Sequence, residues 1–121
     1  METQKNNRPN QVFDDGKVFI GELNTYQDPE NLPIKKVWCV CKAQSSFEKY
    51  KNKGCRLFFV DNREENDMYY TLMVAYPDGK LDFWDMDDIK IEDNHIDEYL
   101  ETFTEEAKNF LLTISQNMKN E

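Results

Sequence analysis

Five segments of the chain carry the residue pattern of β-strands. Each is rich in β-branched and aromatic side chains and is bounded by polar turn formers or prolines. The predicted strands span 17–23, 35–43, 55–60 and 67–76, and a fifth begins at Leu81 after the turn sequence PDGK. In the segment 35–43 the apolar residues fall on both parities, which predicts a strand that is covered on both faces. The segment 44–54, QSSFEKYKNKG, is predicted to be a polar, basic connection.

The period of the apolar residues changes near Asn94. From Ile96 to Met118 they recur in steps of three, four and one, which predicts a helix with one apolar stripe. Asn94 is placed to cap this helix, and acidic residues follow where the helix dipole favours negative charge. Thr102 and Glu105 form a second capping pattern. Two helices that meet near residues 102–104 are therefore the alternative to one long or gently kinked helix.

These elements together predict an α+β fold. An antiparallel sheet of about five strands would carry a C-terminal amphipathic helix, whole or broken in two, on one face. Residues 1–12 hold few apolar groups and are expected to form a disordered N-terminal tail. Residues 13–121 are expected to form a single domain, because a chain of this length fits one hydrophobic core.

Charge narrows the classes of partner. The chain has 24 acidic against 15 basic side chains, for a formal net charge of −9. This excess disfavours direct binding to the phosphate backbone of nucleic acid and favours a basic protein as partner. The charge is also uneven, because residues 35–56 have a net charge of +6 and residues 78–106 one of −10.

The expected location is the cytoplasm. The first residues lack the apolar region of a signal peptide, and no apolar run approaches the roughly 18 residues that span a bilayer. Three cysteines, an odd number, do not resemble the disulfide framework of a small secreted domain. A reducing compartment fits this composition.

A tryptophan stands among four aspartates in the segment 81–88, LDFWDMDD. A strand with one face in the core cannot carry carboxylates there, so it is predicted to end near Phe83 or to bulge at Phe83–Trp84. Either geometry places an aromatic ring and a negative rim at a sheet edge, as in a protein-binding hot spot. The predicted partner-binding residues are Trp84, Asp82, Asp85, Asp87, Asp88 and Tyr70, with Tyr69 as a further candidate. The alternative is a tryptophan that covers the far face of the sheet beside solvated aspartates that protect an edge strand.

The basic segment offers a second candidate site. Hydroxyl groups, cations and aromatic rings alternate there, and such groups can hold phosphate and stack on a base. The residues predicted for an anionic, nucleotide-like ligand are Ser45, Lys49, Tyr50, Lys53, Arg56 and Arg63. The alternative is a solvated loop without a ligand.

No catalytic residue, metal site or cofactor is predicted. Cys39, Cys41, Cys55 and His95 are four potential zinc ligands, but their spacing lacks the CxxC pattern of a zinc knuckle. The acidic run 85–88 resembles a magnesium site only in its carboxylates, because no glycine-rich phosphate loop accompanies it. No local nucleophile pattern surrounds His95. The sequence therefore disfavours an enzyme.

Two functions remain as hypotheses. The first is a small acidic, non-enzymatic inhibitor or sequestering protein of the phage anti-defence or toxin-immunity kind, which binds a basic effector such as a nuclease or another nucleic-acid-binding protein. The second is a protein that sequesters a nucleotide-like ligand at the basic loop, at an oligomer interface because a domain of this size has little room for a deep pocket.

Overall fold

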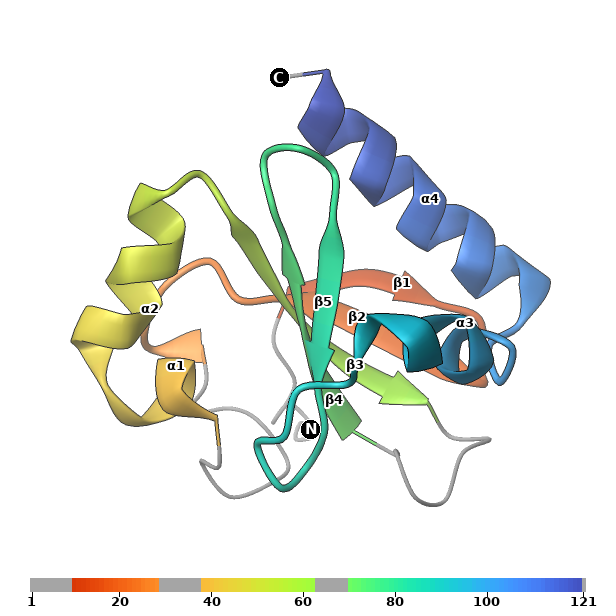
Figure 1. Cartoon of the computed structure of the whole chain (residues 1–121), viewed down its shortest axis with the longest axis horizontal. Helices are drawn as coiled ribbons and strands as arrows, with labels where there is room; N and C mark the ends of the chain where they lie inside the picture. Colours follow the sequence, from red (N-terminus) through yellow and green to blue (C-terminus); the bar gives the residue numbers. More distant parts are fainter. Residues whose placement is uncertain (1–9, 29–37, 63–69, 121) are drawn as a thin grey trace, which may run out of the picture.

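The fold is a five-stranded antiparallel sheet with helices on both faces (Figure 1). The computed structural model describes residues 10–28, 38–62 and 70–120. The strands are β1 (Asn10–Asp14), β2 (Val18–Glu22), β3 (Arg56–Asn62), β4 (Tyr70–Ala75) and β5 (Leu81–Trp84). The helices are α1 (Cys39–Lys42), α2 (Gln44–Asn52), α3 (Asp93–Leu100) and α4 (Glu105–Lys119). The predicted α+β class, with its antiparallel sheet and C-terminal helix, is confirmed.

The sheet is a meander in which every strand pairs with its neighbour in the chain, in the order β1-β2-β3-β4-β5. Four of the five predicted strands are confirmed as β2, β3, β4 and β5. The last of them ends at Trp84, as the carboxylates after it require. The predicted turn between β4 and β5 is also confirmed, and Gly79 supplies its positive φ of 92°.

The strand predicted at 35–43 is wrong over the part that the structure describes. Residues 38–42 form a helical turn instead, with hydrogen bonds from the Cys41 and Lys42 N–H groups to the Trp38 carbonyl at 2.8 and 3.1 Å. A short apolar run of this kind fits a buried helical turn as well as a strand, so periodicity alone does not separate the two. Residues 35–37 lie outside the described residues.

The basic connection predicted at 44–54 is also wrong, because residues 44–52 form α2. Its polar composition hid a narrow apolar stripe in which Phe47 is buried and Tyr50 is half-buried. The two residues are three positions apart and lie on one helix face.

The fifth strand is β1, at the edge of the sheet. It begins at Asn10, so residues 10–12 pair with β2 instead of belonging to a disordered tail, whereas residues 1–9 lie outside the described part of the chain. The register shifts between Gln11 and Phe13. This irregularity lets Phe13 turn inward and stack on Phe110 of α4 at 5.1 Å.

The C-terminal segment is two helices, so the prediction of one long or gently kinked helix is wrong, and the alternative that the second capping pattern indicated is confirmed. The break lies between Leu100 and Glu105, and the cap of α4 is Thr104, whose hydroxyl accepts a hydrogen bond from the Ala107 N–H at 3.1 Å. Asn94 does not cap α3, because that helix begins at Asp93 and Glu92 holds the cap position. The Thr104 hydroxyl also donates to Asp15 in the β1–β2 turn, which fixes the start of α4 against the sheet.

Each face of the sheet has its own core. The α3–α4 face buries the apolar side chains of α3 and α4 on residues such as Ile20, Phe58 and Met73. The α1–α2 face buries Trp38, Phe47 and their neighbours on Leu57, Phe59 and Val74. A helix on one face was predicted correctly, and the second helical layer was not foreseen.

Candidate functional site

The acidic segment after β5 is a closed turn. The Asp85 carboxylate accepts hydrogen bonds from the N–H groups of Asp87 at 2.9 Å and Ile89 at 3.0 Å. The Asp85 N–H in turn donates to the Ile89 carbonyl at 3.0 Å. Asp88 occupies the left-handed region with φ of 62°, which aspartate tolerates better than most residues. Asp85 therefore shapes this turn and is not free to face a partner.

A buried tryptophan holds the turn from the α1 side. The Trp38 indole N–H donates to the Asp85 carbonyl at 2.8 Å, and the Trp38 side chain is fully buried. Burial of an indole requires a partner for its N–H, and here that partner is the first residue of the turn. The turn is thus held in one conformation by the bond from Trp38 and by the bonds between its first residue, Asp85, and its last, Ile89.

Trp84 does not project outward among the aspartates. It is half-buried and packs against the α1–α2 core, on the face opposite α3 and α4. Tyr70 lies on the same face and stacks on Phe59 at 5.3 Å, and Tyr69 lies outside the described residues. This arrangement corrects the predicted hot spot and matches the alternative, in which the tryptophan covers the far face of the sheet.

The four aspartates also diverge. The Asp82 side chain is buried, the Asp85 carboxylate closes its own turn, and Asp87 and Asp88 are exposed. Only the last two of the predicted rim residues therefore present a free carboxylate surface. The parity of the strand could have foreseen part of this, because Asp82 lies within β5 whereas Asp87 and Asp88 lie beyond it.

Exposed acidic side chains follow one another along the chain from this turn through α3 to the start of α4, and we call this set the acidic ridge. Nine exposed side chains form it: Asp87, Asp88, Glu92, Asp93, Asp97, Glu98, Glu101, Glu105 and Glu106. Within the described part of the chain only Asp93 and Glu105 of this set form ion pairs, with Lys80 and Lys90 and with Lys108 respectively. Ile89 lies beside the ridge with 61% of its surface exposed. The ridge thus combines unpaired negative charge with one large apolar side chain.

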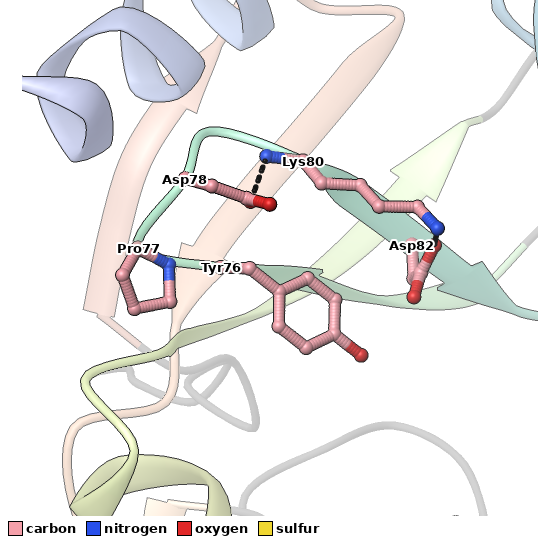
Figure 2. Close-up of a pocket in the computed structure, with 5 residues that line it drawn as sticks. All are labelled: Tyr76, Pro77, Asp78, Lys80 and Asp82. Atoms are coloured by element: carbon pink, nitrogen blue, oxygen red, sulfur yellow. Dashed lines mark hydrogen bonds and ion pairs between the residues drawn. The ribbon is translucent and has the colours of Figure 1, made fainter.

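An open pocket of about 520 Å³ lies at the other end of β5, on the α1–α2 face (Figure 2). It is lined by Tyr76, Pro77, Asp78, Lys80 and Asp82 of the β4–β5 hairpin. Figure 2 shows the Tyr76 ring and the Lys80 side chain extending along the hairpin toward the Asp82 carboxylate. The pocket is shallow and largely open to solvent.

The carboxylate in this pocket is unusual because its charge is buried but incompletely bonded. Only 6% of the Asp82 side chain is exposed, and its Oδ1 atom accepts no hydrogen bond from the described residues. The ammonium groups of Lys80 and Lys90 lie 3.8 and 3.7 Å from Oδ1, close enough for ion pairing but too far for hydrogen bonds. The charge is therefore partly balanced while the acceptor remains open.

Tyr76 completes the polar wall. Burial, followed by the nearby Asp82 carboxylate and its negative charge, raises the pKa of Tyr76 well above its ordinary value of 10.0. The tyrosine hydroxyl therefore keeps its proton. The charge of Asp82, together with Asp93, also raises the pKa of Lys80, which keeps that side chain cationic.

The end of α2 borders the pocket. A Cβ atom placed on Gly54 would lie 3.3 Å from Pro77 Cγ, so the hairpin and the end of α2 are in contact. Burial raises the pKa of the Cys55 thiol, and the charges of Lys53, Lys51 and Asp78 act on it as well. Lys51 and Lys53 thus lie near Cys55, at the end of α2.

The predicted nucleotide-binding residues do not form one site. Arg56 lies on the α3–α4 face, where it forms a bidentate ion pair with Glu22 at 2.8 Å and stacks over Phe58. Ser45 and Lys49 are exposed on α2, Lys53 caps the end of that helix, and Tyr50 packs against the α1–α2 core. Arg63 lies outside the described residues. Of the described members, Tyr50 and Lys53 lie toward the end of α2 that contacts the hairpin.

The cysteines and the histidine are also distributed over both faces. Cys41 and Cys55 are buried on the α1–α2 face, whereas His95 is exposed on α3. The side chain of Cys39 is not described. Over residues 10–28, 38–62 and 70–120 no three His, Cys, Asp or Glu side chains form a group able to hold a metal ion.

The sequence reasoning missed Tyr76, Lys80, Lys90 and Ile89. A usable signal existed for the first two, because residues 76, 80 and 82 share one parity across the predicted turn and so share a face of the hairpin. No local pattern indicates that Lys90 returns to pair with the end of β5.

No protein-family model, curated protein or solved structure matches this chain. None of the helices in the described ranges has the length and apolar character needed to cross a membrane.

Proposed function

We propose that this protein is a small, non-enzymatic inhibitor or sequestering protein of the cytoplasm that binds a basic effector protein through the acidic ridge. A nuclease or another nucleic-acid-binding protein fits this role, because it carries a positive surface that a negative one can cover. Conflict between phage and host, or between a toxin and its immunity protein, is the setting in which such inhibitors act.

The observation that carries the proposal is the rigid turn at the head of the ridge. Asp87, Asp88 and Ile89 are exposed there, while Asp85 and Trp38 fix the backbone beneath them. A pre-organised loop loses little conformational entropy on binding, so its contacts contribute more of their energy to affinity. Ile89 replaces Trp84 as the apolar anchor of the predicted interface.

The charge of the ridge supports the same conclusion. Seven of its nine carboxylates form no ion pair with described residues, so their field is directed outward. Such a field accelerates encounter with a basic surface and opposes nucleic acid. It also makes the interaction sensitive to salt, since ions screen exposed charges over about 10 Å at 0.1 M ionic strength.

The test is quantitative capture of basic proteins from cell extract on the immobilised full chain. We expect one dominant basic protein, whose retention falls steeply between about 0.05 and 0.5 M salt. The variant Asp87→Asn/Asp88→Asn should reduce its retention by about tenfold or more, and asparagine suits the left-handed backbone at residue 88. Ile89→Ala should weaken retention without a change in melting temperature, because the side chain is exposed.

Glu48→Lys is the matched control. It changes the net charge by the same two units, at an exposed site on α2 away from the ridge. Loss of retention in this control to the same extent as in Asp87→Asn/Asp88→Asn would show that overall charge alone governs capture, and the ridge would then have no specific role.

A further inference from the structure

We propose that the pocket between Tyr76 and Asp82 is a second, independent binding site for a nucleotide whose base presents adjacent N–H donors, as guanine does. This site lies on the hairpin, and its link to the acidic ridge is the ion pair of Lys80 with Asp93. The second hypothesis from the sequence placed a nucleotide-like ligand on the basic segment 44–54. The geometry points instead to the β4–β5 hairpin beside it.

The first requirement on the ligand comes from Asp82. Its Oδ1 atom is buried and lacks a hydrogen-bond donor, which is costly for a charged oxygen. A ligand with an N–H group can supply that donor once the half-exposed Lys80 side chain moves aside and uncovers the atom. Each carboxylate oxygen has two lone pairs, so the two oxygens together can accept from two adjacent donors.

The second requirement comes from the charge around Asp82. Lys80 and Lys90 already place two ammonium groups within 4 Å of Oδ1, and a cationic ligand would be repelled by both. A neutral donor avoids this repulsion. Guanidinium and amine ligands are therefore disfavoured, although they too carry N–H groups.

The third requirement comes from the walls. The rings of Tyr76 and Pro77 line the pocket, and Figure 2 shows them near each other at the end of β4. Aromatic side chains stack on nucleobases, which are flat and neutral. A planar heterocycle with N–H donors on one edge thus satisfies both the walls and Asp82.

The fourth requirement comes from the mouth of the pocket. Lys80 is 49% exposed at its side chain, and Lys51 and Lys53 lie at the adjacent end of α2. These cations are placed to attract an anionic group on the outer part of the ligand. A phosphate attached to the base meets this requirement, and the ligand class is therefore a nucleotide.

The experiment is titration of the full-length protein with GMP, AMP, CMP, UMP and free arginine, followed by calorimetry and by amide shifts in NMR spectra. GMP should bind, and its shifts should be largest at Tyr76, Asp78 and Lys80. We expect the affinity for each of the other nucleotides to be lower by about tenfold or more, because their bases lack two adjacent N–H donors. Removal of the phosphate, as in guanosine, should weaken binding and reduce its salt dependence.

Asp82→Asn is the direct variant, and it should lower GMP affinity by about tenfold or more. Asp88→Asn is the control for charge, since it lies outside the pocket, and it should leave GMP affinity unchanged. If Asp82→Asn does not fold, the location of the wild-type shifts still decides the question. A ridge variant that loses its protein partner but binds GMP normally would separate this proposal from the one above.

Three results would overturn the proposal. The first is an absence of shifts with any nucleotide at millimolar concentration. The second is equal affinity for all four nucleotides, because that would show attraction of phosphate without recognition by Asp82. The third is a different ligand or a different location. Binding of arginine in place of GMP would contradict the ligand chemistry, and GMP shifts centred on Ser45 and Lys49 would place the site on α2.

Discussion

The two faces of the sheet are covered by helices in different ways. On the α3–α4 face a helix of 15 residues lays one apolar stripe across the strands, and the buried Tyr99 hydroxyl is paired with Thr71 at 2.8 Å. On the α1–α2 face the helices have only four and nine residues, and β5 contributes Asp82 beside the apolar core. Polar chemistry is thus satisfied on the first face and left open at the edge of the second.

This difference shows how stability and binding are divided within a small domain. A continuous apolar face lowers the free energy of the folded state without needing any ligand. Short helices have little stability of their own and depend on the packing beneath them. The pocket lies on this face, on the hairpin whose Pro77 contacts the end of α2.

The largest expected effect comes from α4. Leu111→Ala removes a buried side chain from the α3–α4 core and should lower the free energy of unfolding by about 2–5 kcal/mol. Leu112→Ala is the neighbouring control, and its 60% exposure predicts a change within about 0.5 kcal/mol. Urea denaturation measures both. Equal effects at the two positions would contradict the assignment of the buried stripe.

A smaller effect is expected at the α1–α2 face from Trp38→Phe. The variant loses the indole bond to Asp85 and leaves a small cavity. Both changes should lower the free energy of unfolding, by about 1–3 kcal/mol in total. The same change should accelerate hydrogen exchange at the Ile89 amide, because the turn is no longer held from below. Trp84→Phe, in a half-buried position, should cost less and leave that exchange rate unchanged. Unaltered exchange in Trp38→Phe would show that the turn is rigid without the indole.

The smallest effect, Tyr76→Phe, depends on pH. The raised pKa means that the folded state favours the protonated hydroxyl, so its stabilising contribution is complete below pH 10.0 and is lost as pH rises above that value. We expect wild type to lose stability as the pH rises above 10.0 and the phenylalanine variant to lose less, because it has no hydroxyl to deprotonate. Urea denaturation at several pH values measures this difference in the free energy of unfolding. A difference that stays constant to the highest accessible pH would contradict the raised pKa of Tyr76.

The sequence predicted the parts of the fold that depend on one dominant period. The strands at 17–23, 55–60 and 67–76 and the stripe from Ile96 to Met118 are examples, because many residues repeat the same preference. The strand prediction for the segment 35–43 failed because so few apolar residues fit a buried helical turn as well as a strand. The edge strand β1 failed because its composition is polar, and its pairing depends on β2 rather than on its own side chains.

The candidate sites were harder to predict for a different reason. Asp85, Asp87 and Asp88 were expected to act alike, but a single hydrogen-bonded turn separates the first from the other two. Arg56 was grouped with Lys49 by proximity in the chain, yet the pleat of β3 directs it to the opposite face, where Glu22 binds it. Such outcomes depend on contacts between residues that are distant in sequence.

The β4–β5 hairpin tip touches both helical layers, which are otherwise separated by the sheet (Figure 1). Its Pro77 meets the end of α2, and its Gly79 carbonyl accepts a bond from Ser115 of α4 at 2.6 Å. A side chain at residue 79 would collide with Lys119, so the two segments interlock closely. The last turns of α4 therefore help to hold the hairpin tip in place, and we expect a displacement of these turns to change the space between Tyr76 and Asp82.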